Sequence, residues 1–175
     1  MTTQQAAQTV LPTGTWILDA SKTTVTVTAR KTGVFTIPAT LTVTSGSIEV
    51  NESGQVANVD IVVDAASYAS KNAKRNEHVI GGDFLDAGKH PTITFHAGAV
   101  TATGGGQQAK GTVTINGKTS PIDVAVDDVE FTDLTGAFTA TATVDRKAIG
   151  VAKLPAFIIG RRLDLTVTAT AERSA

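Results

Sequence analysis

Cysteine is absent from the 175 residues of this chain, and aromatic residues make up only 5% of them. Without cysteine the chain has no disulfide framework, no thiolate-ligated metal or iron–sulfur centre and no thiol nucleophile. Long apolar runs are also missing, since none approaches the ~20 residues that a membrane-spanning helix needs. The sequence therefore predicts no transmembrane segment and a fold held together without covalent cross-links.

An excess of charge of either sign is missing too, with 15 Lys plus Arg against 16 Asp plus Glu. Domains that hold nucleic acid or an anionic membrane usually carry a basic excess, so the sequence predicts no nucleic-acid partner and gives no support to a membrane partner. The N-terminus lacks the basic and apolar regions of a signal peptide, so the expected location is the cytoplasm. Residues 1–12 are expected to be a flexible tail, and residues 13–175 a single domain with a sizeable core.

What the chain does have is alternation of apolar and polar residues. Apolar positions recur at every second residue, and most positions between them are Thr or Asp. This period is typical of antiparallel strands with one dry face, and β-branched Val and Thr suit such a surface. About eight strands at short spacing predict an all-β antiparallel barrel or sandwich. The alternating stretches are 24–29, 35–43, 59–63, 93–97, 113–115, 122–126, 138–144 and 163–171.

Turn signals separate these strands. Asn116-Gly117 predicts a tight hairpin, because both central residues of a type I′ turn need positive φ. Gly104-Gly105-Gly106 predicts a loop, and two further turns are expected at Ser45-Gly46-Ser47 and Ser53-Gly54.

Two stretches interrupt the alternation. Residues 71–90 are expected to contain one or two short helical turns, and residues 147–162 are expected to be irregular. Irregular segments inserted in a regular barrel are where mouths and lids tend to form. Simple plugs at the barrel ends are the alternative.

The predicted inner face carries small side chains and no charged residue. A barrel lined by Ala and Val, with few rings, leaves its lumen under-filled, and unfilled volume costs stability unless a guest occupies it. An apolar, elongated guest is the expected partner. The open alternative is a dry, filled barrel or sandwich in which the alanines pack under another element. The inward alanines are Ala29, Ala97, Ala140, Ala142, Ala169 and Ala171.

Motifs for nucleotide binding or nucleophilic catalysis are weak. Asn116-Gly117-Lys118-Thr119 resembles the end of a P-loop, but Thr112 stands where the first glycine is needed. A Gly-x-Ser-x-Gly elbow is absent. Three dibasic pairs near predicted strand ends are interpreted as solvated or salt-bridged rim residues, with contact to a ligand head group as the alternative: Arg30-Lys31, Arg146-Lys147 and Arg161-Arg162.

The histidines and the nearby acids predict neither a metal site nor catalytic residues. The spacings of His78, His90 and His96 match no helical pair of metal ligands. Asp83 and Asp86 are interpreted as caps of a short helical turn. Two alternatives remain open. One is a metal site of two histidines with one of these carboxylates. The other is an enzyme acting on a hydrophobic small molecule, with His78 and either carboxylate as its acid–base groups.

Several segments in the right order resemble the YceI-like family. The resemblance covers about Gly14 to Glu172 and begins with Trp16-Ile17-Leu18-Asp19. At Asn76 the chain departs from the family, which usually has Asp there. The specific segments are Arg75-Asn76-Glu77-His78-Val79, Asp83-Phe84-Leu85-Asp86 and His90-Pro91-Thr92-Ile93-Thr94-Phe95, and the weaker ones are 111–119 and 146–151.

The resemblance implies an extended, lipocalin-like antiparallel barrel that carries or sequesters a polyisoprenoid, an isoprenoid quinone or a similar lipid. It also implies a connection with isoprenoid transport or stress responses. No cofactor is expected other than such a bound lipid. Arg75 and His78 are expected to anchor the irregular segment, and a homodimer through strand edges is left open. The residues expected to contact the ligand are Phe35, Leu41, Val43, Ile61, Phe95, Phe138, Ala140, Ala142 and Val167, with Phe84 and Phe157 near the mouth.

Overall fold

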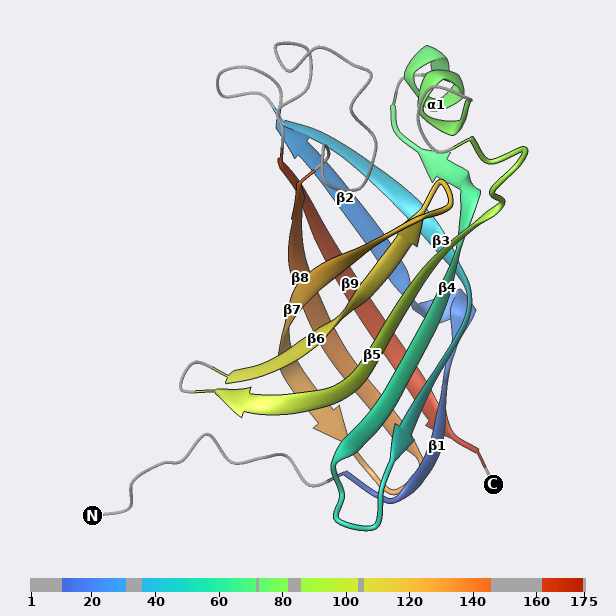
Figure 1. Ribbon diagram of the computed structural model, residues 1–175. Coiled ribbons are helices and arrows are strands. Elements are labelled where there is room, and N and C mark those ends of the chain that lie inside the picture. The colour runs from blue at the N-terminus through green and yellow to red at the C-terminus, as the bar shows by residue number, and fades with distance from the viewer. Residues whose placement is uncertain are drawn as a thin grey trace.

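Nine strands form one antiparallel sheet that closes on itself (Figure 1). The computed structural model describes residues 11–30, 36–71, 73–81, 86–103, 106–145 and 162–174. The predicted all-β barrel with short helical segments is confirmed. Its elements are β1 (Gly14–Leu18), the 3-10 turn η1 (Ala20–Lys22), β2 (Thr24–Arg30), β3 (Thr36–Val50), β4 (Val56–Ala69), α1 (Ala73–Ile80), β5 (Thr92–Thr103), β6 (Gly106–Ile115), β7 (Lys118–Phe131), β8 (Thr135–Asp145) and β9 (Arg162–Arg173).

The barrel has eight strand positions, because β1 and β2 share one of them. Both pair with β3 on one side and β9 on the other, and β3 pairs with β4 to close the ring. The turn η1 separates β1 from β2 at Asp19, whose carboxylate accepts hydrogen bonds from the Ser21 amide (3.0 Å) and hydroxyl (2.6 Å). Every position in the ring thus has a neighbour on both sides, so a homodimer through a strand edge would require the ring to open.

Two of the predicted turns are confirmed. Asn116 and Gly117 adopt φ values of 51° and 72°, as a type I′ turn between β6 and β7 requires. Gly54 adopts a φ of 76° in the β3–β4 turn and donates its amide hydrogen to the Asn51 carbonyl at 2.9 Å. Of the predicted glycine loop, Gly104 and Gly105 lie outside the described residues, and β6 already begins at Gly106.

The turn predicted at Ser45-Gly46-Ser47 is wrong, because β3 runs through it without interruption. The pairing of β3 with β4 shifts register between Val43 and Ser45, which marks a bulge in a long strand. A Cβ atom at Gly46 would lie 2.5 Å from Leu18 Cδ1, so glycine is needed here for close packing. The glycine that suggested a turn is therefore explained by the close approach of β3 to Leu18 in β1.

The predicted helical turns of residues 71–90 are present as α1, which covers the end of β4. Asn76 attaches the helix, because its Oδ1 accepts hydrogen bonds from the Ser70 amide (2.7 Å) and hydroxyl (2.6 Å) and its Nδ2 donates to the Ser70 carbonyl (3.3 Å). Asp86 follows the helix with a φ of 47°, and its carbonyl accepts hydrogen bonds from Lys89 N and His90 N. No helix in the described part of the chain is long and apolar enough to cross a membrane.

The barrel end opposite α1 is closed by packed side chains. Trp16 is 0% exposed there, its Nε1 donates to the Pro12 carbonyl at 3.0 Å, and its ring meets Phe131 edge to face at 4.8 Å. Leu11, which the sequence placed in the flexible tail, is 7% exposed, and its amide donates to the Gly54 carbonyl at 2.9 Å. This cluster of Leu11, Trp16 and Phe131 is called the Trp16 end below, and the other end is called the α1 end.

Candidate binding site in the barrel interior

The strand register identifies the side chains that face the barrel interior. Paired residues on neighbouring strands point to the same face of a sheet, and the buried core marks that face as the inner one. One inward row crosses β3, β2, β9, β8, β7 and β6 through Ala39, Val27, Leu165, Ala142, Val124 and Ala109. The adjacent row consists of Leu41, Val25, Val167, Ala140, Val126 and, on β6, the partly buried Gln107. Both rows are uncharged, made mostly of Ala and Val, and apolar apart from Gln107.

The interior is packed unevenly along the barrel. Toward the Trp16 end, Ala97, Ala169 and Ala171 are at most 1% exposed. In the two rows above, several residues pack against the core and are only partly buried, although they point into a closed barrel. These residues are Val27, Leu165, Ala142, Val167 and Val126.

Most of the residues expected to contact a ligand lie on this inner face. They divide into a buried group near β3, β4 and β8, and a partly buried group on β5, β8 and β9. The buried group is Leu41, Val43, Ile61 and Ala140, and the partly buried group is Phe95, Phe138, Ala142 and Val167. Phe35, Phe84 and Phe157 lie outside the described residues. Contact with a ligand stays a prediction for all of them.

Three of the partly buried inward residues were missed as candidate lining residues: Val27, Leu165 and Val126. Their alternation already placed them on the apolar face. What the sequence did not provide is the pairing of β2 with β9 and of β7 with β8, which brings them beside the predicted Ala142, Val167 and Ala140. Cross-strand register depends on contacts between distant segments, so a single strand pattern does not contain it.

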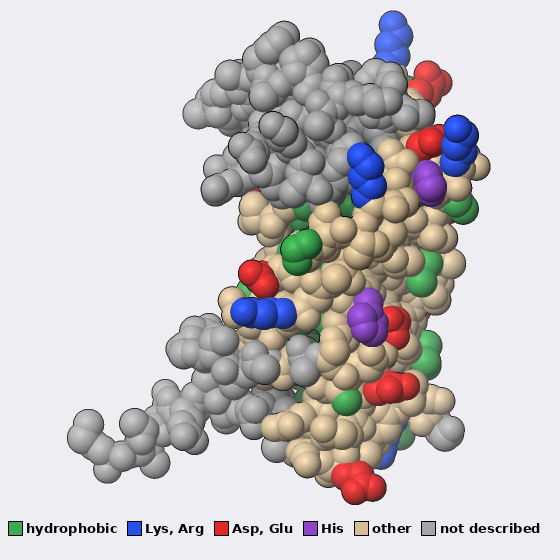
Figure 2. All heavy atoms as spheres, in the orientation of Figure 1, with side chains coloured by type: hydrophobic (Ala, Val, Ile, Leu, Met, Phe, Trp, Pro, Cys, Tyr) green, Lys and Arg blue, Asp and Glu red, His purple; other side chains and the backbone are tan. Residues whose placement is uncertain are grey.

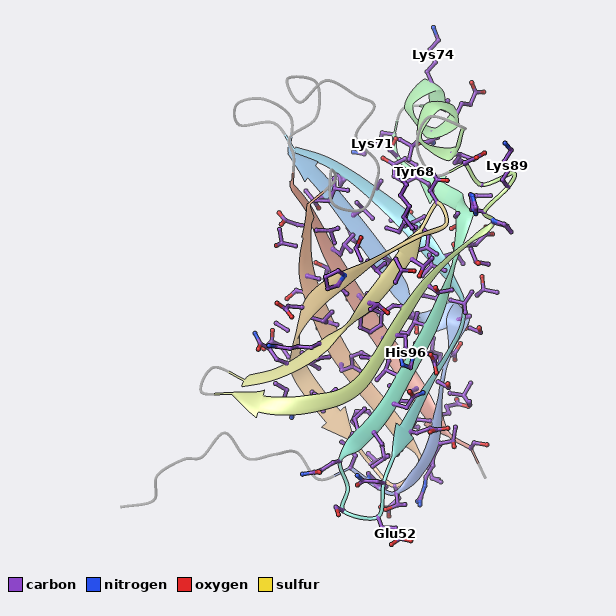
Figure 3. All side chains as sticks on the ribbon, in the orientation of Figure 1. Glu52, Tyr68, Lys71, Lys74, Lys89 and His96 are labelled. Atoms are coloured by element: carbon purple, nitrogen blue, oxygen red, sulfur yellow. The ribbon has the colours of Figure 1, made fainter. Side chains whose placement is uncertain are left out.

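Among the described residues, polar groups on the inner face are few, and one of them is Gln107, the register partner of Val126. Ser120, 8% exposed, is the register partner of Val113 on β6. Tyr68 is partly buried against the core at the α1 end (Figure 3). Within the described residues no three His, Asp or Glu side chains gather in a way that could hold a metal ion. This interior is suited to a ligand selected by its width and length.

The histidines lie in different surroundings. On the outer wall, His96 Nδ1 lies 2.6 Å from Asp60 Oδ1, and Asn58 Nδ2 donates to Asp60 Oδ2 at 2.6 Å. The hydrogen bond with His96, followed by that from Asn58, holds the pKa of Asp60 below its ordinary value of 3.8. Since His96 and Asp60 are 56% and 53% exposed, solvent screens the pair and its contribution to stability is small. The His90 ring packs at the α1 end, where a Cβ atom on Gly117 would lie 2.8 Å from its Cε1.

The backbone of Arg75 and His78 lies in α1, whereas their side chains are outside the described residues. Among the described side chains of α1, Asn76, one position beyond Arg75, forms hydrogen bonds with Ser70 just after β4, and Val79 and Ile80 pack against the core. Asp83 also lies outside the described residues, and because the His78 side chain does too, the alternative of an acid–base pair of His78 with Asp83 or Asp86 stays untested.

A closed antiparallel barrel with one packed end and an apolar inner face is a lipocalin-like β-barrel. Within that class, this chain belongs to the YceI-like family, because the YceI-like domain matches residues 16–171.

Curated relatives match part of the chain. A UPF0312 protein of Vibrio vulnificus is 38% identical over 87 residues, which are 49% of this chain and 46% of that protein. A UPF0312 protein of Pseudomonas aeruginosa is 30% identical over 112 residues, 61% of this chain and 59% of that protein. The chain spans about half the length of the curated relatives it matches.

Solved structures share the fold over nearly their whole length. BcnA of Burkholderia cenocepacia superposes with a TM-score of 0.71 at 22% identity, covering 87% of this chain and 98% of BcnA. A polyisoprenoid binding domain from Saccharophagus degradans, implicated in plant cell wall breakdown, gives a TM-score of 0.64 at 10% identity, covering 91% of this chain and 98% of that domain. At these identities the likeness concerns the fold.

Proposed function

We propose that this protein binds a long apolar ligand, such as a polyisoprenoid, an isoprenoid quinone or a similar lipid, inside the barrel and carries or sequesters it. One observation carries the proposal: apolar side chains that point into a closed barrel remain only partly buried. They lie next to one another on β2, β9 and β8, with Val27, Leu165 and Ala142 in register. Protein interiors are normally close-packed, so such a surface is stabilised when a guest covers it.

The chemistry of the inner face selects the class of ligand. Each methylene group removed from water contributes about 0.8 kcal/mol, so a chain of a dozen or more carbons binds tightly without specific hydrogen bonds. A charged ligand would lose its hydration among the two inward rows, which contain no charged residue to compensate it. The name of the polyisoprenoid binding domain from Saccharophagus degradans, which shares the fold, supports the same class of ligand.

Binding is favoured over catalysis. The inward rows offer no acid, base or nucleophile, and the pair of His96 with Asp60 lies on the outer wall beside Asn58. A role in storage or transfer of the ligand requires only the apolar interior.

The test is native mass spectrometry of freshly purified protein together with analysis of an organic extract. The wild-type protein should carry a bound lipid or take up an added polyprenol. Ala142→Phe places a ring on the partly buried inner face and should abolish that occupancy while the barrel stays folded. Thr141→Phe is the matched control, because Thr141 is the exposed neighbour on the outer face of the same strand.

Two outcomes would contradict the proposal. One is repeated absence of any bound lipid, together with no uptake of polyprenol. The other is that Ala142→Phe unfolds the barrel in the way expected of an over-packed core, at a cost of about 1–3 kcal/mol. Thermal unfolding of both variants distinguishes a displaced ligand from a lost fold.

A further inference from the structure

Charge is distributed unevenly along the barrel axis, although the whole chain carries a net charge of only -1. Basic residues outnumber acidic ones among the described residues of the α1 end. Four of the lysines there are exposed: Lys71, Lys74, Lys89 and Lys118. Arg75 lies in α1, and Arg30 and Arg162 are the terminal residues of β2 and β9 at the same end. The acidic residues of this end are Asp64, Glu77, Asp86, Asp145 and Asp164, of which Glu77 is exposed and Asp64, Asp86 and Asp164 are partly buried.

The Trp16 end has the opposite sign. Its acidic residues outnumber its basic one, Arg173, and comprise Glu49, Glu52, Glu130, Asp133 and Glu172. On the face that Figure 2 draws, Lys and Arg side chains stand together with some Asp and Glu around the α1 end, whereas Asp and Glu predominate toward the other end. In Figure 3, Lys71, Lys74 and Lys89 lie beside α1, whereas Glu52 lies at the opposite extremity.

The two ends act on their surroundings independently. A 14-residue strand such as β4, rising about 3.3 Å per residue and tilted as barrel strands are, separates them by roughly 35 Å. Charges in solution are screened over about 8 Å at physiological ionic strength, so the acidic end does not cancel the field of the lysines. The balanced composition that spoke against an anionic surface as a partner describes the whole chain and not this end.

We propose that the α1 end docks on an anionic lipid bilayer through Lys71, Lys74, Lys89 and Lys118. The choice of a bilayer rests on the proposed function, since an apolar ligand is exchanged where such ligands dissolve. The ligand cannot pass the Trp16 end without unpacking a residue that is 0% exposed, so the lysine end is the one that meets the source. Lysines are compact point charges that suit a layer of anionic head groups, whereas duplex recognition favours arginine forks in a groove.

The test is co-sedimentation of the full chain with vesicles of phosphatidylglycerol and phosphatidylcholine, compared with pure phosphatidylcholine vesicles. A lysine near an anionic membrane contributes about 1 kcal/mol, or roughly a fivefold change in partition. Lys71→Gln with Lys74→Gln should thus lower the partition coefficient about 25-fold. The matched control is Lys22→Gln with Lys110→Gln, which removes the same charge from exposed positions away from the α1 end and should change it little.

The proposal is overturned if both double variants lose binding equally, or if neutral and anionic vesicles bind alike. It is also overturned if a short DNA duplex binds more tightly than the anionic vesicles at the same salt concentration and with the same dependence on Lys71 and Lys74. Mass spectrometry of the same double variants reports bound lipid separately. A protein that carries lipid and ignores vesicles refutes the docking alone, and one that docks but never holds a lipid refutes the proposed function.

Discussion

At Gly136 the absence of a side chain decides how the Trp16 end packs. A Cβ atom there would lie closer than van der Waals contact to the Phe131 ring, which in turn meets Trp16 edge to face at 4.8 Å. The glycine lies within β8 and is paired with both Phe131 and Ala171. Glycine weakens a strand, so its presence here indicates that space for the ring outweighs the loss of strand propensity.

Gly136→Ala should destabilise the protein by about 1–3 kcal/mol, because the added methyl group over-packs a closed cluster. In a Phe131→Leu background the same substitution should cost much less, so the two changes should be coupled in a double-mutant cycle. Denaturant unfolding measures all four proteins. Gly98→Ala is the control, since a Cβ atom at Gly98 would meet nothing within 4 Å. Equal costs in both backgrounds would show that the Phe131 ring is not the obstacle.

At the scale of the element, Asn76 makes the hydrogen bonds that the described side chains of α1 form with the chain just after β4. Asn76 makes three hydrogen bonds to Ser70, two as acceptor and one as donor. Val79 and Ile80 add apolar contacts with the core. Because the helix spans only eight residues, its own backbone hydrogen bonds are too few to keep it folded without such contacts.

Asn76→Ala should loosen α1 locally, at a cost of about 1–2 kcal/mol, because the three hydrogen bonds between Asn76 and Ser70 are lost. Hydrogen exchange should speed up at the Gly81 amide, which closes the last turn on the Glu77 carbonyl. Asn76→Asp keeps both acceptor contacts and should retain most of the protection. Asn58→Ala, which removes an amide bonded to Asp60 on the outer wall, is the matched control and should leave α1 unchanged. Unchanged exchange in Asn76→Ala would mean that Val79 and Ile80 hold the helix unaided.

Elements were predictable where the signal is local. Alternation located the strands. Asn116-Gly117 located a hairpin, because a type I′ turn requires only that its two central residues adopt positive φ. Ser45-Gly46-Ser47 carries the same kind of signal and failed, since Gly46 is needed against Leu18, which is distant in sequence. The inner face could be predicted strand by strand for Ala142 and Val167. Their neighbours Leu165 and Val27 became part of the site only through register, which long-range pairing sets.

At the scale of the whole molecule, the two ends of the barrel differ in packing and in charge. The Trp16 end combines a fully buried tryptophan with acidic surroundings, and the α1 end carries the exposed lysines. The partly buried inward residues, such as Ala142 and Leu165, lie between these ends. A ligand would have to displace the fully buried Trp16 to enter at the Trp16 end, and on an anionic surface the lysines would turn the other end toward the bilayer.

This asymmetry predicts the direction of loading. The sequence contains no cysteine, so a single introduced thiol is a unique attachment point. A bulky maleimide-linked polymer on Lys118→Cys, in the α1 end, should slow the uptake of a fluorescent polyprenol, and a larger polymer should slow it further. The same polymer on Glu52→Cys, in the β3–β4 turn at the Trp16 end, should leave the rate unchanged. Stopped-flow fluorescence from detergent-dispersed ligand measures the rate without vesicles, so docking does not influence it. Slower uptake from the Glu52 attachment alone would reverse the assignment, and Trp16 would then have to move aside during loading.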